Sequence, residues 1–138
     1  MFTSSSSLEG QTAKLETLLV VDDDPDVRDL TAEILRERGY RVLEAGSGEE
    51  AVRLAADFPR PIHLLLTDVL MPRMDGPTLA RNLCARRPGL KVLYMTGYSG
   101  RSLAAADGEL PRGTEVLTKP FTFNDLTSRV RAVLEPDA

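Results

Sequence analysis

Four aspartates, a threonine and a lysine stand where short apolar segments of the chain give way to turns. They are Asp22, Asp23, Asp24, Asp68, Thr96 and Lys119. Carboxylates that share one crevice repel each other unless a cation lies among them. Oxygen ligands with room for water suit Mg²⁺, and a lysine opposite them can hold an anionic oxygen. These residue types therefore describe a site for a phosphoryl group beside a metal ion, provided that the fold brings them together.

Asp68 is the candidate for the reacting group of such a site. It follows Leu64-Leu65-Leu66, the composition of a strand that is buried on both faces. An aspartate can act as a nucleophile and form an aspartyl phosphate, and phosphoryl transfer asks the protein mainly for positioning and charge neutralisation. The simpler alternative is that Asp68 only caps the helix that follows it.

Apolar segments and turn signals alternate along the chain. Strands are predicted at residues 18–21, 40–44, 62–67, 90–95 and 115–118, and helices at 25–39, 47–58, 77–87, 101–107 and 122–134. Asp24 and Pro25 suit the first turn of a helix, and Ser47 and Glu50 have the spacing of a capping box. The segment 101–107 is short, alanine-rich and bracketed by glycines.

Five strands that alternate with helical segments indicate an α/β fold, a doubly wound parallel sheet with helices on both faces. The carboxyl ends of parallel strands meet at one edge of the sheet, and right-handed crossovers gather the following loops there. We therefore expect Asp22, Asp23, Asp68, Thr96 and Lys119 to lie on one rim although they are far apart in the sequence.

Composition limits the class of protein. With 138 residues, the chain is long enough for one domain at 17–135, preceded by a serine-containing flexible lead-in or linker at 1–16 and followed by a tail at 136–138. A net charge of −4 argues against a nucleic-acid partner. No apolar run is long enough to span a membrane and no signal peptide is evident, so we expect no membrane contact. A single cysteine, Cys84, fits a reducing cytoplasm.

Four short motifs occur in order, each at the end of a predicted strand. They are VVDDDP at 20–25, TDVLMPRMDG at 67–76, MTGY at 95–98 and TKPF at 118–121. Each motif is weak alone, but together they resemble the receiver domains of two-component signalling, the response-regulator family, over residues 16–135. The sequence MTGYSG at 95–100 resembles that of receivers attached to hybrid sensor histidine kinases, although a single-domain regulator also fits. The resemblance implies a flavodoxin-like fold with strand order 2-1-3-4-5.

The resemblance also implies a role for each site residue. Asp68 would accept the phosphoryl group, Lys119 and Thr96 would contact its oxygens, and the backbone amides of Leu70 and Gly97 would add hydrogen bonds. Asp22, Asp23, Asp68 and the Leu70 carbonyl would bind Mg²⁺. The Lys119–Pro120 bond would be cis. The phosphoryl donor would be a histidine kinase or a histidine phosphotransfer domain, and the chain's own His63 is expected to be a packed or edge residue.

Two other classes share parts of this pattern. A phosphatase of the haloacid dehalogenase type also uses an aspartate nucleophile and Mg²⁺, but it needs an Asp-x-Asp motif and usually a cap domain. A flavodoxin-like FMN protein needs a phosphate loop after the first strand, where Asp22-Asp23-Asp24 would repel a phosphate. A receiver is not an enzyme in the usual sense, because it catalyses only its own phosphorylation and dephosphorylation. Val116 stands where many receivers carry an aromatic residue.

Overall fold

The structure is a computed structural model that describes residues 15–97 and 114–135. In this part of the chain, five parallel strands form one sheet in the order β2-β1-β3-β4-β5. The strands are β1 (Thr17–Val21), β2 (Arg41–Ala45), β3 (Leu64–Asp68), β4 (Lys91–Thr96) and β5 (Glu115–Thr118). The helices are α2 (Pro25–Glu37), α3 (Gly48–Asp57), α4 (Gly76–Arg86) and α6 (Phe123–Leu134). The predicted fold class and the strand order are confirmed, and β2 lies at one edge of the sheet.

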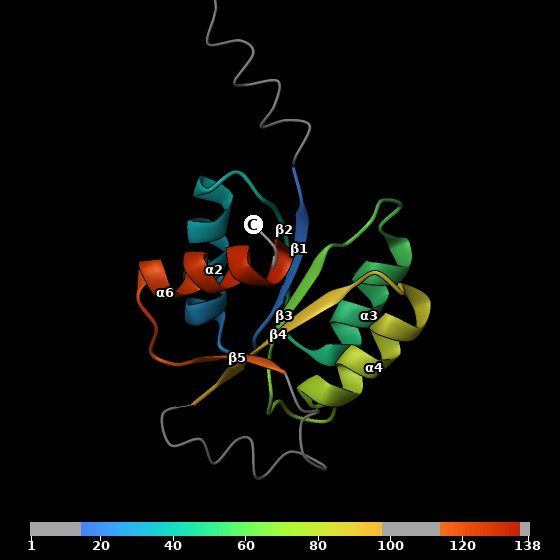
Figure 1. Ribbon diagram of the computed structural model, residues 1–138. Coiled ribbons are helices and arrows are strands. Elements are labelled where there is room, and N and C mark those ends of the chain that lie inside the picture. The colour runs from blue at the N-terminus through green and yellow to red at the C-terminus, as the bar shows by residue number, and fades with distance from the viewer. Residues whose placement is uncertain (1–14, 98–113, 136–138) are drawn as a thin grey trace, which may run out of the picture.

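The helices cover both faces of the sheet, with α2 and α6 on one face and α3 and α4 on the other (Figure 1). Successive strand residues point to opposite faces. Leu18 and Val20 therefore pack in the core beneath α2 and α6, whereas Leu19 and Val21 pack in the core beneath α3 and α4. Each fully buried aliphatic side chain contributes about 1.5–3 kcal/mol by leaving water. Two cores thus hold the central strands on both sides.

Side-chain caps fix where the helices begin. Asp24 Oδ1 accepts hydrogen bonds from the backbone N–H groups of Asp26 and Val27, so Asp24 caps α2 as predicted. Thr122 and Asp125 form a full capping box at the start of α6. At the C-terminal end of α2, Gly39 has a φ of +97°, a left-handed conformation that glycine adopts without strain.

The capping box predicted for Ser47 and Glu50 is only half formed. The hydroxyl of Ser47 accepts the Glu50 N–H at 3.1 Å, but Glu50 Oε1 accepts from the Gly46 N–H at 2.7 Å, one residue before the cap. The β2–α3 connection is therefore closed by a carboxylate that bonds Gly46.

The third strand begins at Leu64, two residues later than predicted, and it includes Asp68. His63 precedes its first residue: the imidazole Nδ1 of His63 accepts the backbone N–H of Thr17 at 3.0 Å, and the backbone N–H of His63 donates to the Thr17 carbonyl. His63 thus has a structural role at the opposite end of the sheet from Asp68. The predicted helix at 101–107 lies outside the described residues. No helix in the described ranges has the length and apolar content needed to cross a membrane.

Candidate functional site

Asp68 is the last residue of the central strand β3, and its side chain is nearly covered. All five residues of β3 are buried, and Asp68 is 7% exposed. Strands β1 and β4 flank β3: Val20 and Val21 stand beside Leu66 and Thr67, and Asp68 itself is paired with Met95 of β4. A fully buried central strand therefore positions this carboxylate.

The loop after β3 folds back onto the Asp68 backbone, and Gly76 makes this approach possible. The Gly76 N–H donates to the Val69 carbonyl at 2.7 Å. A Cβ on Gly76 would collide with the carbonyl oxygen of Asp68. Asp75 caps α4 by accepting the Thr78 N–H. The helix after the strand is thus capped by Asp75, and the alternative that Asp68 serves only as its cap is wrong.

Two further carboxylates come from the acidic loop, which we define as Asp22, Asp23 and Asp24 after β1. Asp22 is 1% exposed, and its Oδ1 accepts the Asp24 N–H at 2.9 Å. Asp23 is exposed. Carboxylate oxygens of Asp22, Asp23 and Asp68 lie within 4.8 Å of one another. Asp24 turns away to cap α2, and the three aspartates expected on the rim converge.

Lys119 reaches two of these carboxylates from the end of β5. Its Nζ lies 2.9 Å from Asp22 Oδ2 and 2.7 Å from Asp68 Oδ1. Its backbone N–H donates to the Thr96 carbonyl at 2.7 Å, and the following bond to Pro120 is cis, as predicted. One ammonium group therefore bridges two buried acids: Asp22, which directly follows β1, and Asp68, which ends β3.

One lysine does not fully compensate two buried carboxylates. Burial, together with the hydrogen bond and charge of Asp22, raises the pKa of Asp68 from 3.8 to about 7, although Lys119 acts in the opposite direction. Burial of Lys119 favours its neutral form, but its hydrogen bonds to Asp68 and Asp22 outweigh this, so the pKa of Lys119 is raised. The site therefore holds excess negative charge, which a cation would neutralise.

The remaining predicted residues lie on the same rim. Thr96 is the last residue of β4 and is 3% exposed, and Gly97 follows it directly. Leu70 lies two residues after Asp68, with a side chain that is 43% exposed. Strand pairing places Thr96 beside Thr118, next to Lys119. The structure thus brings the predicted residues to one edge of the sheet; Tyr98 of the MTGY motif lies outside the described residues.

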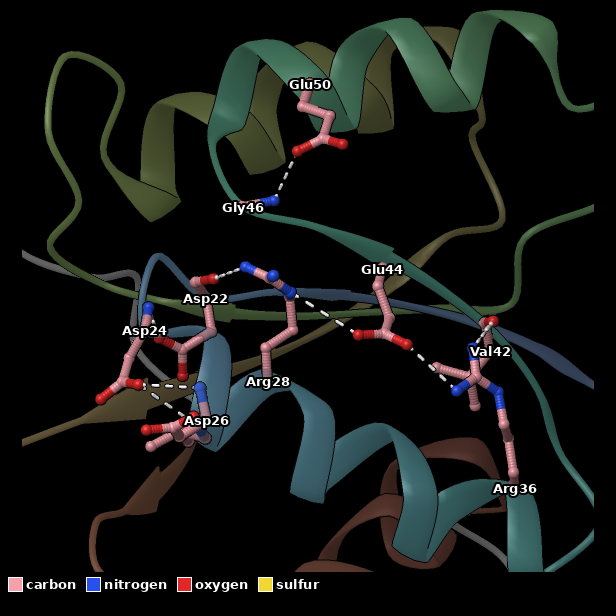
Figure 2. Close-up of polar contacts among 10 residues, drawn as sticks. Asp22, Asp24, Asp26, Arg28, Arg36, Val42, Glu44, Gly46 and Glu50 are labelled. Carbon is pink, nitrogen blue, oxygen red and sulfur yellow. Dashed lines mark hydrogen bonds and ion pairs between the residues drawn. The ribbon is translucent and has the colours of Figure 1, made fainter.

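Arg28 is a site neighbour that the sequence analysis did not single out. Its Nη1 donates to the backbone carbonyl of Asp22 at 2.9 Å (Figure 2). The signal in the sequence was an arginine within the first turns of the helix that follows the acidic residues. That signal is weak, because helix surfaces carry many arginines and their contacts depend on the neighbouring strands.

Comparisons with known proteins agree with this geometry. The sequence matches the family model for the "Response regulator receiver domain" over residues 18–131. It is 35% identical over 120 residues to the response regulator receiver protein CpdR of Brucella abortus, an alignment that covers 87% of this chain and 98% of that protein. It is 36% identical to the sensor kinase CckA of the same organism, covering 86% of this chain but only 12% of the kinase.

A solved structure is also similar. The crystal structure of the receiver domain from the hybrid histidine kinase CckA aligns with a TM-score of 0.66 and 35% identity, over 86% of this chain and 98% of that one. Neither the hydrolase nor the FMN alternative is favoured by these matches. The chain belongs to the response-regulator receiver domain family, and it is a phosphoacceptor switch module of two-component signalling.

Proposed function

We propose that Asp68 is the residue that accepts the phosphoryl group, and that the donor is a phosphohistidine of a histidine kinase or a histidine phosphotransfer domain. The observation that carries this proposal is the 2.7 Å ion pair of Asp68 with Lys119 at the end of the central strand. A carboxylate oxygen of Asp68 attacks phosphorus, and the bond from phosphorus to the donor's ring nitrogen breaks. The imidazole leaves with that electron pair and takes up a proton.

Mg²⁺ is the proposed cofactor, bound by Asp22, Asp23, Asp68 and the backbone carbonyl of Leu70. The donor set fits a hard cation, because the three carboxylates supply only oxygen atoms and these lie within 4.8 Å of one another. The ion would neutralise the carboxylates and the phosphoryl oxygens. Lys119 would hold a phosphoryl oxygen, Thr96 would donate a hydroxyl hydrogen bond, and the amides of Leu70 and Gly97 would complete the contacts.

The domain is proposed to span residues 17–135, with a lead-in at 1–16 and a tail at 136–138. It acts on no second substrate: it catalyses only its own phosphorylation and dephosphorylation. The proposed setting is the cytoplasm, where histidine kinases use ATP to form phosphohistidine. The similarity to the receiver of CckA supports a kinase-linked role, and the similarity to CpdR supports a single-domain role equally well.

Intact-mass measurement after incubation with acetyl phosphate and Mg²⁺ tests the proposal. The wild-type protein should gain one phosphate, and Asp68→Asn should gain none. Asp24→Asn is a matched control, because asparagine caps helices as well as aspartate does and Asp24 turns away from the site. A stoichiometric phosphate on Asp22 or His63, or no phosphate on the wild type, would overturn the assignment.

A further inference from the structure

The backbone of Asp22 is held at both ends of the residue. Its N–H donates to the Ala45 carbonyl of β2 at 3.2 Å, and its carbonyl accepts from Arg28 Nη1 at 2.9 Å. The side chain is held as well, by the Asp24 N–H and by Lys119. Because the Asp22 carbonyl belongs to the peptide that leads into Asp23, its orientation sets the direction in which Asp23 projects.

Arg28 is itself anchored by the sheet (Figure 2). Its Nε lies 3.6 Å from Glu44 Oε1, and Glu44 Oε2 lies 3.0 Å from Arg36 Nη1. Arg36 in turn donates to the Val42 carbonyl at 2.8 Å. Two guanidinium groups on α2 thus share one carboxylate on β2, and only the guanidinium of Arg28 extends to the acidic loop. The Arg28 side chain is 22% exposed, so this contact is largely shielded from water.

The β2–α3 connection fixes the other side of the Arg28 guanidinium. A Cβ on Gly46 would lie 3.0 Å from Arg28 Nη1, closer than most real contacts of this kind. Gly46 is held in turn by the carboxylate of Glu50, at 2.7 Å from its N–H. The guanidinium therefore fits between the Asp22 carbonyl and a glycine that has no side chain to displace it.

We propose that Arg28 is a positioning residue for the cation site: by holding the Asp22 carbonyl, it sets the acidic loop in the orientation that presents Asp22 and Asp23 to a divalent cation. This inference rests on the proposed function. Residues that orient the ligands of a metal typically change its affinity by about 10–100-fold when they are replaced. Because the contact here is to a backbone carbonyl and not to a ligand side chain, the lower end of that range is expected.

The sign of the effect separates positioning from simple electrostatics. Arg28 carries a positive charge beside the acidic loop, so on electrostatic grounds alone its removal would make the site more negative and strengthen cation binding. Loss of the carbonyl contact would instead release the acidic loop and weaken binding. The two accounts therefore predict opposite changes in Mg²⁺ affinity for Arg28→Met, a variant that keeps an apolar stem of similar length.

The test is calorimetric titration of Mg²⁺ into the full-length unphosphorylated protein, together with urea unfolding without metal. Arg28→Met should bind Mg²⁺ about tenfold more weakly, and Arg28→Lys, which keeps the charge and a donor, should recover part of the loss. Arg36→Met is the matched control. It also removes a positive charge that pairs with Glu44, but it leaves the hydrogen bond from Arg28 to the Asp22 carbonyl in place, so its Mg²⁺ affinity should be unchanged. Unchanged or tighter binding by Arg28→Met would overturn the inference.

Gly46→Ala provides a second perturbation if Arg28→Met does not fold. The added methyl group should push the guanidinium away from the Asp22 carbonyl without changing any charge, and it should weaken Mg²⁺ binding in the same direction. With acetyl phosphate, Arg28→Met should regain the wild-type phosphorylation rate at saturating Mg²⁺. A rate that stays low at saturating Mg²⁺ would contradict a role through the cation site, whereas a wild type that takes no phosphate would refute the proposed function instead.

Discussion

Replacing Asp68 by asparagine is expected to stabilise the metal-free protein at about pH 8, although it removes one ion pair. The carboxylate is 7% exposed and shares Lys119 with Asp22. Asparagine has nearly the same shape and carries no charge. The substitution therefore removes the cost of burying a second anion, while the ion pair of Asp22 with Lys119 remains.

The magnitude follows from the raised pKa of Asp68. A shift from 3.8 to about 7 would correspond to about 4 kcal/mol at most, at 1.36 kcal/mol per unit. Water that reaches the open side of the site, and the loss of the bond to Lys119, reduce this value. We expect a gain of about 1–2 kcal/mol in the free energy of unfolding for Asp68→Asn at about pH 8.

The same shift fixes the pH dependence. A group with a raised pKa in the folded state binds its proton more tightly there than in the unfolded chain. Protonation of Asp68 therefore contributes to the free energy of unfolding at low pH, and this contribution is lost as the pH rises through about 7. Metal-free wild type should therefore lose stability between about pH 4 and about pH 7, and Asp68→Asn should lack this part of the slope.

Urea unfolding followed by circular dichroism, with a chelator present, measures both quantities at about pH 5 and about pH 8. The advantage of Asp68→Asn should grow with pH. Asp24→Asn, which removes an exposed carboxylate of the acidic loop, should show no such growth. If Asp68→Asn is less stable than wild type at the higher pH, the bond to Lys119 outweighs the cost of burial and the electrostatic reasoning is refuted.

Three other substitutions test separate parts of the site. Gly76→Ala should destabilise the protein by about 1–3 kcal/mol in urea unfolding, because its Cβ would meet the Asp68 carbonyl. Gly89→Ala, with open space around it, should be nearly neutral. Equal effects of the two substitutions would contradict the steric explanation. Lys119→Met should lower the free energy of unfolding by about 3 kcal/mol at about pH 8, because it leaves buried carboxylates without a cation. The loss should be smaller at about pH 6, where Asp68 takes up a proton. A loss that does not depend on pH would argue against this cause. Asp23→Asn should change the metal-free free energy of unfolding by no more than about 0.5 kcal/mol, because this side chain is exposed. It should nevertheless abolish most of the rise in melting temperature that Mg²⁺ causes. A full rise with Mg²⁺ would show that Asp23 is not a ligand.

The sequence by itself determined the fold class and which acidic and basic residues meet at one edge of the sheet. Leu64-Leu65-Leu66 indicated a strand buried on both faces, and Asp24-Pro25 and Thr122 marked helix starts; the structure confirms all three. These features are local: burial on both faces, turn chemistry and capping each depend on residues a few positions apart. Because parallel strands end at a common edge, the meeting of Asp22, Asp68 and Lys119 also followed from the order of elements.

What only the tertiary structure decided is how charge is shared within the site. Lys119 and Asp22 are 97 positions apart, and no local pattern indicates that one ammonium group bonds both Asp22 and Asp68. The pKa of Asp68 depends on this arrangement, because burial and through-space charge act across strands. Likewise, the contact of Arg28 with the Asp22 carbonyl depends on Glu44 of β2, which pairs with its guanidinium, and on the absence of a side chain at Gly46. Side-chain direction at such a site is set by packing between elements, which the order of residues along the chain does not encode locally.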